Sequence, residues 1–236
     1  MKKIGMIGYT DKVDLISSIA KILNYTGKNV LVIDATSDKK YKYIIPAIET
    51  TDNCYISQYN KIDFAVGFDS FNDVENYLSS QAINISLYDY LIFDIDNPKT
   101  YEFFRGKGFD KTFIYYDTSI LTLKKNVEII NTLKVYNLES EFKPYKVLYR
   151  GYLTRASENY FNEKLNSLDV NFDEKEFEIL EEEMDKMLYL DFQVSSIMNI
   201  KKHTKNFIIT VCEISSYILE DINTNQLIKI VKKGGI

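Results

Sequence analysis

The sequence of 236 residues contains no tryptophan, one histidine, two cysteines, three prolines and nine glycines. Cys54 and Cys212 are too far apart in sequence to indicate a disulfide framework or a zinc cluster. His203 lies among lysines with no second histidine to share a ligand, so we expect it at the surface rather than on a metal. These scarcities indicate a reduced, cytoplasmic setting and no metal centre built from cysteine and histidine.

Long apolar runs and an excess of basic charge are also missing. No stretch approaches the ~20 apolar residues of a membrane span, and the apolar run after Met1 is too short for a signal peptide. The formal net charge of -5 argues against general nucleic-acid binding, which requires a basic face. Because prolines and glycines mark no linker, residues 1–236 are expected to form a single α/β domain.

What the chain does contain is an alternation of apolar strands and amphipathic helices. The predicted strands are residues 3–7, 29–34, 62–68, 88–94, 111–116, 145–149 and 186–190, and the predicted helices are 13–24, 70–80, 119–133, 157–165 and 207–219. The basic run 39–42 is expected in a solvated loop, and the acidic run within 173–185 on a solvated helix face. This order predicts an α/β fold with a doubly wound, mostly parallel sheet and helices on both faces.

The turn between the first strand and the first helix reads Gly-Tyr-Thr-Asp-Lys-Val-Asp from Gly8 to Asp14. A phosphate cradle at such a turn needs several glycines, because successive backbone N–H groups must converge on the anion. Here only Gly8 meets that need. Lys12 stands at the lysine position of a phosphate loop, but Val13 replaces the hydroxyl residue that would hold Mg²⁺.

Asp11 and Asp14 place two negative charges at this turn. A carboxylate ~4 Å from a phosphate oxygen costs about 1 kcal/mol in water and about 4 kcal/mol at an effective dielectric near 20. Asp11 is expected to be the N-cap of a helix that starts at Lys12, with Asp14 supporting the same turn. We infer that these carboxylates occupy the anion site, although a capped helix that never bound phosphate predicts the same local structure.

The first 135 residues together resemble the ParA/MinD family of P-loop ATPases. The resemblance is carried by residues 3–7, Lys12, the helix 15–23 with Gly27, and residues 30–34, 88–94 and 111–133. It implies that Lys12 matches the phosphate-loop lysine, Asp34 the aspartate that ends the second strand, and Asp94 the Walker B aspartate. Members are ATP-switched dimers that position plasmids, division sites, flagella or pili through partners, membranes or DNA.

The chain departs from the family pattern at the phosphate loop itself. The family's Lys-Gly-Gly-x-Gly-Lys-Thr is replaced, the second signature lysine has no counterpart, and the Mg²⁺ hydroxyl is lost at Val13. We therefore expect the fold without the ATPase activity: no catalytic residue, no cofactor, and a regulatory or scaffolding role through protein partners, with a homodimer as one option. The alternative is an active ATPase that binds ATP and Mg²⁺ through Gly8, Lys12, Asp34 and Asp94.

Two other interpretations use the strand-end carboxylates. Asp94-Ile95-Asp96 resembles the first motif of haloacid-dehalogenase-type phosphotransferases, although two strands precede it here and that motif normally opens the domain. Alternatively, Asp34, Asp94, Asp96 and Asp117 could hold Mg²⁺ at one edge of the sheet. Such residues more often end strands and cap helices.

The C-terminal residues 226–236 alternate apolar side chains with lysines. MinD-like proteins similarly end in a short basic amphipathic helix that lies on membranes, which implies at most weak membrane contact here. The simpler expectation is that this segment is the tail of the last core helix.

Overall fold

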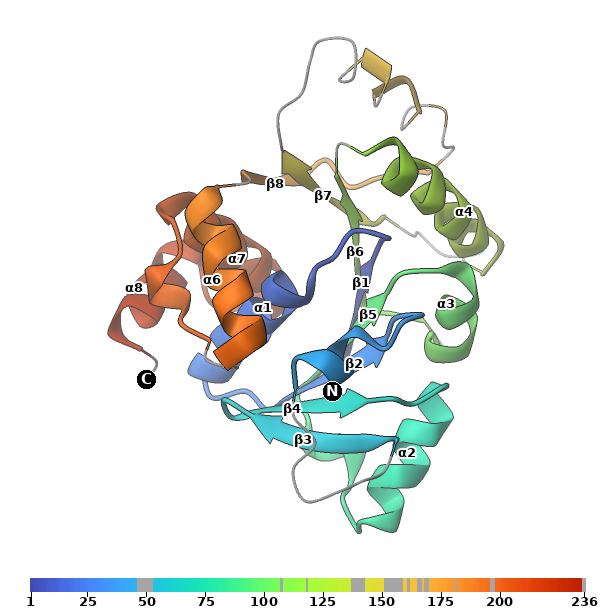
Figure 1. Cartoon of the computed structure of the whole chain (residues 1–236), viewed down its shortest axis with the longest axis vertical. Coiled ribbons are helices and arrows are strands. Elements are labelled where there is room, and N and C mark those ends of the chain that lie inside the picture. The colour runs from blue at the N-terminus through green and yellow to red at the C-terminus, as the bar shows by residue number, and fades with distance from the viewer. Residues whose placement is uncertain are drawn as a thin grey trace.

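The computed structural model describes residues 1–45, 53–106, 108–117, 119–136, 143–150, 159–160, 162–164, 167, 170–180, 182–195 and 198–234. Its centre is an eight-stranded sheet in the order β3-β4-β2-β5-β1-β6-β7-β8 (Figure 1). The strands are β1 (Lys2–Ile7), β2 (Val30–Ala35), β3 (Tyr55–Tyr59), β4 (Ile62–Val66), β5 (Tyr90–Ile95), β6 (Lys111–Tyr116), β7 (Tyr145–Arg150) and β8 (Glu176–Leu180). All neighbours pair in parallel except β3 and β4.

Helices cover both faces of this sheet, which confirms the predicted fold class. The helices are α1 (Val13–Tyr25), α2 (Phe71–Ser80), α3 (Pro98–Phe104), α4 (Ile120–Tyr136), α6 (Glu183–Ser195), α7 (Lys205–Leu219) and α8 (Thr224–Lys233). One face carries α1, α6, α7 and α8, and the other carries α2, α3 and α4 (Figure 1). Strands β2 and β5 are buried along their whole length, which explains their nearly continuous apolar runs.

Local signals located several elements closely. Ser70 is the N-cap of α2, with its hydroxyl accepting from the Asp73 N–H, and the predicted inward residues Phe71, Val74 and Leu78 are buried. Strand β6 has the predicted bounds, and β1, α1, β2, β5, β7 and α7 differ from prediction by a few residues at most. Apolar periodicity and capping were therefore sufficient for the core of the sheet.

Four predicted features are wrong. Residues 186–190 belong to α6 rather than to a strand, because a short apolar run does not distinguish the two. The segment 173–185 is only partly helical: Glu183 is exposed in the first turn of α6, as predicted, but residues 176–180 form β8, in which exposed glutamates alternate with buried Phe177 and Ile179. The basic run forms a short 3-10 helix, η1 (Lys40–Tyr43), in which Tyr41 is buried. In α4, the apolar spacing predicts Leu121 on the buried side together with Leu123 and Leu133, but Leu121 is exposed.

Two further segments complete the comparison with the sequence. Strand β3 was not predicted, because the surrounding segment is mostly polar. The helix predicted at 157–165 lies partly outside the described residues. Two more 3-10 turns, η2 (Ile85–Leu87) and η3 (Ile200–Lys202), connect neighbouring elements.

The C-terminal helix α8 packs on the body of the protein. Asn223 and Gln226 form a capping box at its start, and Leu227 and Val231 are fully buried against the core shared with α1 and α7. Its apolar face is thus already covered, and contact with lipid would require it to undock. Among the described residues, no helix combines the length and apolar character needed to cross a membrane.

Candidate functional site

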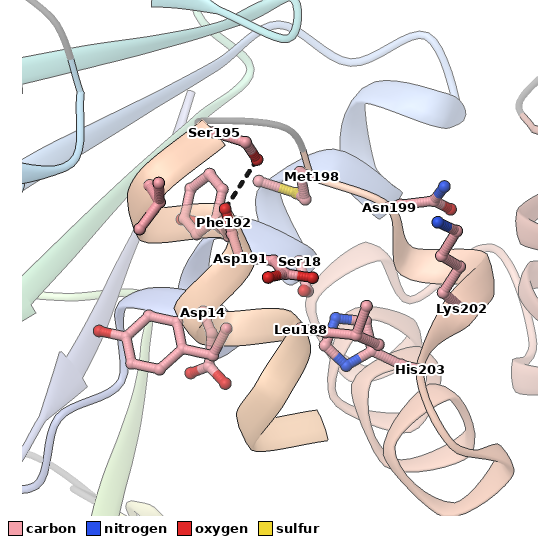
Figure 2. Close-up of a pocket in the computed structure, with 13 residues that line it drawn as sticks. Asp14, Ser18, Leu188, Asp191, Phe192, Ser195, Met198, Asn199, Lys202 and His203 are labelled. Atoms are coloured by element: carbon pink, nitrogen blue, oxygen red, sulfur yellow. Dashed lines mark hydrogen bonds between the residues drawn. The ribbon is translucent and has the colours of Figure 1, made fainter. Parts of the chain in front are cut away.

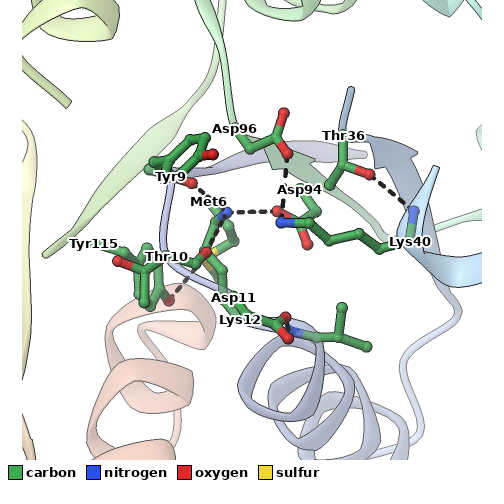
Figure 3. A network of polar contacts seen from close by, with 12 residues as sticks. Met6, Tyr9, Thr10, Asp11, Lys12, Thr36, Lys40, Asp94, Asp96 and Tyr115 are labelled. Atoms are coloured by element: carbon green, nitrogen blue, oxygen red, sulfur yellow. Dashed lines mark hydrogen bonds and ion pairs between the residues drawn. The ribbon is translucent and has the colours of Figure 1, made fainter. Parts of the chain in front are cut away.

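The candidate site lies at the carboxyl edge of the central strands, where ligands of doubly wound sheets bind. Parallel pairing of β2 with β5 places Asp34 directly opposite Asp94, and Met6 of β1 pairs with Asp94 from the other side. The loop from Gly8 to Lys12 leaves β1 at the same edge. The structure therefore brings together Gly8, Lys12, Asp34 and Asp94, the four residues that the resemblance assigned to a nucleotide. Figure 3 shows Lys12 and Asp94 pointing toward each other.

The loop is fixed at its beginning by bonds to neighbouring strands and to α4. Gly8 has φ 148° and donates its N–H to the Ile95 carbonyl at 2.9 Å. A Cβ at this position would lie 2.5 Å from the Tyr115 carbonyl oxygen, so glycine is required here for packing alone. The Tyr9 N–H donates to Asn126 Oδ1 at 2.8 Å, and the Asn126 amide donates to the Tyr115 carbonyl at 2.7 Å. The Tyr9 amide is thus held by protein groups.

Lys12 points into the protein and not toward a ligand space. Its side chain is 0% exposed, and its Nζ lies 2.6 Å from Asp94 Oδ1. The same ammonium donates to the carbonyls of Gly8 at 2.7 Å and Thr10 at 3.3 Å. An ammonium has three donors, and here three protein oxygens receive them. Lys12 is therefore neutralised and fully bonded inside the fold.

Asp94 receives a second donor from Tyr41, which covers the ion pair from the β2 side. The Tyr41 hydroxyl donates to Asp94 Oδ2 at 3.2 Å, and the tyrosine is fully buried. Burial raises the pKa of Asp94, although Lys12 opposes that shift. Burial and the carboxylates of Asp94 and Asp34 hold the pKa of Tyr41 well above its usual range. Lys12, Asp94 and Tyr41 form a unit that we call the closed triad.

Asp34 holds the turn between β2 and η1 and thereby positions Tyr41. Its carboxylate accepts from the Thr36 N–H at 3.1 Å, the Thr36 hydroxyl at 2.6 Å and the Tyr41 N–H at 3.1 Å. Burial raises its pKa to about 6, with these hydrogen bonds opposing the shift. The strand-end aspartate of the sequence prediction thus organises η1.

Asp96 is also committed to contacts within the protein. It accepts from the Ser37 N–H at 2.8 Å and the Asn97 amide at 2.9 Å, and it pairs with Lys40 at 3.4 Å. Burial would raise the pKa of Asp96, but Lys40 and these hydrogen bonds lower it. Lys40 was expected in solvent; instead its ammonium neutralises this edge of the sheet.

Asp11 lies one residue before the N-cap position of α1. Helix α1 begins at Val13, and its N-cap position is Lys12, whose side chain makes no capping bond. The prediction that Asp11 is the N-cap is wrong, because the chain turns into the helix one residue later than expected. Asp11 still accepts the Val13 N–H at 3.2 Å, and its other oxygen accepts the Tyr189 hydroxyl of α6 at 2.7 Å.

Asp14 lies in the first turn of α1, as predicted, but the effect of its negative charge on stability is the opposite of the predicted one. It accepts the Leu15 N–H at 2.7 Å, but burial and the neighbouring Asp11 raise its pKa to about 7. A raised pKa means that the folded state favours the protonated carboxyl. Ionised Asp14 therefore costs stability, whereas the sequence predicted that its charge would stabilise the helix.

The fourth strand-end carboxylate, Asp117, is bonded away from the other three. It accepts from the hydroxyls of Thr10 at 3.2 Å and Thr122 at 3.0 Å, and from the Ser119 N–H at 2.8 Å. Among the described residues, no group of three or more histidine, cysteine or acidic side chains is placed to hold a metal ion. Each of the four strand-end carboxylates therefore accepts hydrogen bonds or an ion pair from other groups of the protein.

His203 is not the exposed histidine that the sequence predicted. Its ring stacks on Phe207 with centroids 4.3 Å apart, and its Nδ1 lies 3.0 Å from Asp185. Burial lowers its pKa, with Asp185 opposing the shift. The flanking lysines gave no sign of this, because the decisive partner is on α6.

Two cavities flank α6. One of about 350 Å³ lies beside the loop and is lined by Thr10, Asp11, Asp14, Asp117, Ser119, Tyr149, Ile179, Leu180, Glu182, Asp185, Lys186, Tyr189 and Phe207. The other, of about 290 Å³, lies between α6, α1 and η3, with Asp14, Ser18, Phe192 and His203 among its lining residues (Figure 2). Five carboxylates against one lysine line the first cavity, which disfavours a polyphosphate there.

ATP with Mg²⁺ does not fit the residues present. The loop contains one glycine where a cradle needs several, and Lys12 has no donor left for a phosphate oxygen. Val13 offers no hydroxyl to Mg²⁺, and the adjoining cavity is acidic. Binding would require the closed triad to open first.

Sequence reasoning missed Tyr41, Asn126 and Tyr189 as parts of this site. One signal was available: Tyr41, Ile44 and Ile45 follow helical spacing, and all three are buried. Tyr41 was not recognised as a buried residue because the lysines on both sides of it indicated a solvated loop. Asn126 and Tyr189 could not be found from the sequence, because their partners lie 117 and 178 residues away.

Comparison with known proteins identifies the fold. No family model matches the chain, and no curated protein matches it. Solved structures do. A chain of the MinC:MinD cell division protein complex from Aquifex aeolicus matches at TM-score 0.55 with 14% identity, covering 99% of this chain and 95% of that one.

A plasmid partition protein from Borrelia burgdorferi B31 with bound AMPPNP matches at TM-score 0.54 with 16% identity, covering 94% of this chain and 99% of that one. A ParA family ATPase from Chlorobium tepidum TLS matches at TM-score 0.53 with 11% identity, covering 98% and 97%. This protein therefore has the ParA/MinD fold. The likeness extends over nearly the whole chain, well beyond the 135 residues that carried the resemblance in sequence.

Proposed function

We propose that this chain is a ParA/MinD-like protein whose nucleotide site is closed by its own side chains. It acts as a non-catalytic, cytoplasmic regulatory or scaffolding partner in positioning or assembling a cellular machine, such as plasmid partition, cell division, a flagellum or a pilus. The observation that carries this proposal is the buried Lys12–Asp94 ion pair at 2.6 Å. The two residues that an ATPase would direct at phosphate and metal are bonded to each other.

The surroundings of the pair support a permanent closure. The Tyr41 hydroxyl donates to Asp94, and the Tyr41 N–H donates to Asp34, so Tyr41 is held in place over the ion pair by both its side chain and its backbone. Removing one member of a buried pair costs about 3 to 5 kcal/mol, because it leaves an uncompensated charge. A ligand that recruited Lys12 would have to supply a comparable free energy before any net binding.

The alternative is an ATP-switched ATPase with an unusual loop. It is favoured by one observation: Lys12, Asp34 and Asp94 still meet at the carboxyl edge where a ligand would bind. This alternative requires Tyr41 to withdraw and Lys12 to exchange Asp94 for phosphate. A haloacid-dehalogenase-like reaction is less favoured, because Asp94 and Asp96 each already bind a lysine.

Association state separates the proposal from the alternative. The family resemblance implies dimers that enclose ATP, so a chain with a closed site should show the same oligomeric state with and without nucleotide. Sedimentation velocity with and without ATP and Mg²⁺, together with phosphate release measured on the same samples, is the test. We expect one unchanged distribution and no phosphate release. A dimer that forms only with ATP would support the alternative and contradict the proposal.

A further inference from the structure

The cavity of about 290 Å³ between α1, α6 and η3 has a polar wall that the fold leaves unused (Figure 2). Ser17 and Ser18 of α1 line this cavity and are 0% and 1% exposed. The buried hydroxyl of Ser17 has no hydrogen-bond partner among the described residues. Leaving a buried hydroxyl unbonded costs stability, and a ligand that bonded to it would remove that cost. Ser17 therefore indicates a ligand position in this cavity.

Asp14 brings a poorly compensated negative charge to the same wall. It lies three residues before Ser17 on α1, so the two side chains are neighbours on one face of the helix. The nearby charges that raise the pKa of Asp14, after burial, are Asp11 and Asp185, and both are negative. Asp191 of α6 adds a further carboxylate to the lining. A cation in the cavity would stabilise the ionised form of Asp14.

The cationic side chains of the cavity do not supply that charge. Among the described lining residues, Lys202 is the one with an ammonium group; it is exposed, and it lies well away from Asp14 in Figure 2. The ring of His203 is held by Asp185 and Phe207, and burial lowers its pKa, so it is neutral at pH 7 and above. The cavity thus offers a ligand an excess of carboxylate and hydroxyl oxygens.

We propose that this cavity binds a small organic amine. Its ammonium group would bond to Asp14 and Ser17, which together present acceptor oxygens to a group with three donors. Its apolar body would pack against Phe192 of α6 and against Met198, which line the remainder of the cavity. At about 290 Å³ the cavity is at the lower end of the range for small-molecule sites, so the ligand is compact.

An anion fits this cavity less well, because it would face Asp14 and Asp191 with only exposed Lys202 to bind it. The neighbouring cavity of about 350 Å³ is more acidic, but its Asp11 and Asp117 already accept from two and three protein donors. The inference does not depend on the proposed function, since neither the closed triad nor a nucleotide takes part in it. Failure of one therefore does not imply failure of the other.

Methionine methyl NMR of the full chain at pH 8 is the direct test, because Met198 lines the cavity and Asp14 is ionised at that pH. The probes are phenylethylamine, phenylethanol and phenylacetate, which have similar shapes and carry positive, zero and negative charge. We expect the amine to shift the Met198 signal saturably and to leave fully buried Met6 of β1 unchanged. The alcohol should bind at least about tenfold more weakly than the amine, and phenylacetate more weakly still.

Variants locate the ammonium group. Asp14→Asn should weaken amine binding by about tenfold or more and leave alcohol binding unchanged. Ser17→Ala should weaken amine binding about threefold or more without loss of stability, because its hydroxyl has no partner to lose. Asp73→Asn, in the first turn of α2 on the opposite face of the sheet, is the matched control and should bind the amine like wild type.

Three results would overturn the proposal. The first is an unmoved Met198 signal at saturating amine, which would mean that the amine binds elsewhere or not at all. The second is equal or tighter binding of phenylethanol or phenylacetate, which would show that the cavity does not select a cation. The third is wild-type amine affinity in Asp14→Asn, or an equal loss of affinity in Asp73→Asn.

Discussion

The Nζ of Lys12 lies 2.6 Å from Oδ1 of Asp94, and neither side chain is more than 1% exposed. If Lys12 served only to bind phosphate, truncating its side chain would change the free energy of unfolding of the ligand-free protein very little. Here Lys12→Met should lower the free energy of unfolding by about 3 to 5 kcal/mol, because it leaves the Asp94 carboxylate buried without a counter-charge. Urea unfolding at neutral pH, followed by circular dichroism, measures this difference.

A second variant separates loss of the charge pair from loss of packing. Lys12→Met with Asp94→Asn removes both charges of the pair and keeps an oxygen for the Tyr41 hydroxyl, so it should recover most of the stability lost by Lys12→Met alone. Lys229→Met, at an exposed position on α8, is the matched control and should stay within about 0.5 kcal/mol of wild type. If Lys12→Met behaved like that control, the closed triad would not be a structural unit.

Tyr41 should contribute through its hydroxyl as well as its ring. Tyr41→Phe removes the donor to Asp94 Oδ2 and should cost about 1.5 to 3 kcal/mol, the range for a hydrogen bond to a charged group. Tyr43→Phe, two residues away and 82% exposed, provides the control and should be nearly neutral. Thermal and urea unfolding of both variants make the comparison. Equal effects would show that the hydroxyl of Tyr41 does not hold the site closed.

Stability should depend on pH through Asp14. Its pKa in the folded protein is about 7, above the ordinary value of 3.8, so the folded state binds the proton more tightly than the unfolded state does. The free energy of unfolding contributed by this group is therefore fully present below about pH 4 and falls as pH rises toward 7. Asp14→Asn cannot ionise, and it should be more stable than wild type at pH 8 but not at pH 4.

Urea unfolding at both pH values tests this sign, with Asp191→Asn, at an exposed position of α6, as the control that should not change the slope. An Asp14→Asn variant less stable than wild type at pH 8 would mean that the carboxylate stabilises the helix after all, through the dipole and the Leu15 N–H.

The parts of this fold that could be predicted from the sequence are those that depend on residues close together in the chain. The Ser70 cap, the spacing of Phe71, Val74 and Leu78, and the buried runs of β2 and β5 depend on neighbours in sequence, and they placed those elements correctly. Strand β8 was missed because charge count outweighed the alternation that buries Phe177 and Ile179.

The candidate site divides in the same way. Lys12, Asp34 and Asp94 were identified from motif positions, and strand topology brought them together as expected. Their bonding to one another was not predictable, because it depends on the register that sets Asp34 opposite Asp94 and on the turn that inserts Tyr41. Both arise from packing between segments more than 50 residues apart.

Titration calorimetry of the wild-type chain with ATP and Mg²⁺ tests the central claim most directly, with Asp11→Gly measured alongside. We predict no saturable heat at millimolar ATP for either protein, since removing Asp11 leaves Lys12 bound to Asp94 and restores neither the glycines nor the Mg²⁺ hydroxyl. Micromolar binding would add about 4 kcal/mol of apparent stability at millimolar ATP, visible as a raised melting temperature. Such binding, in the wild type or in Asp11→Gly, would show that the closed triad opens for nucleotide and would contradict the account.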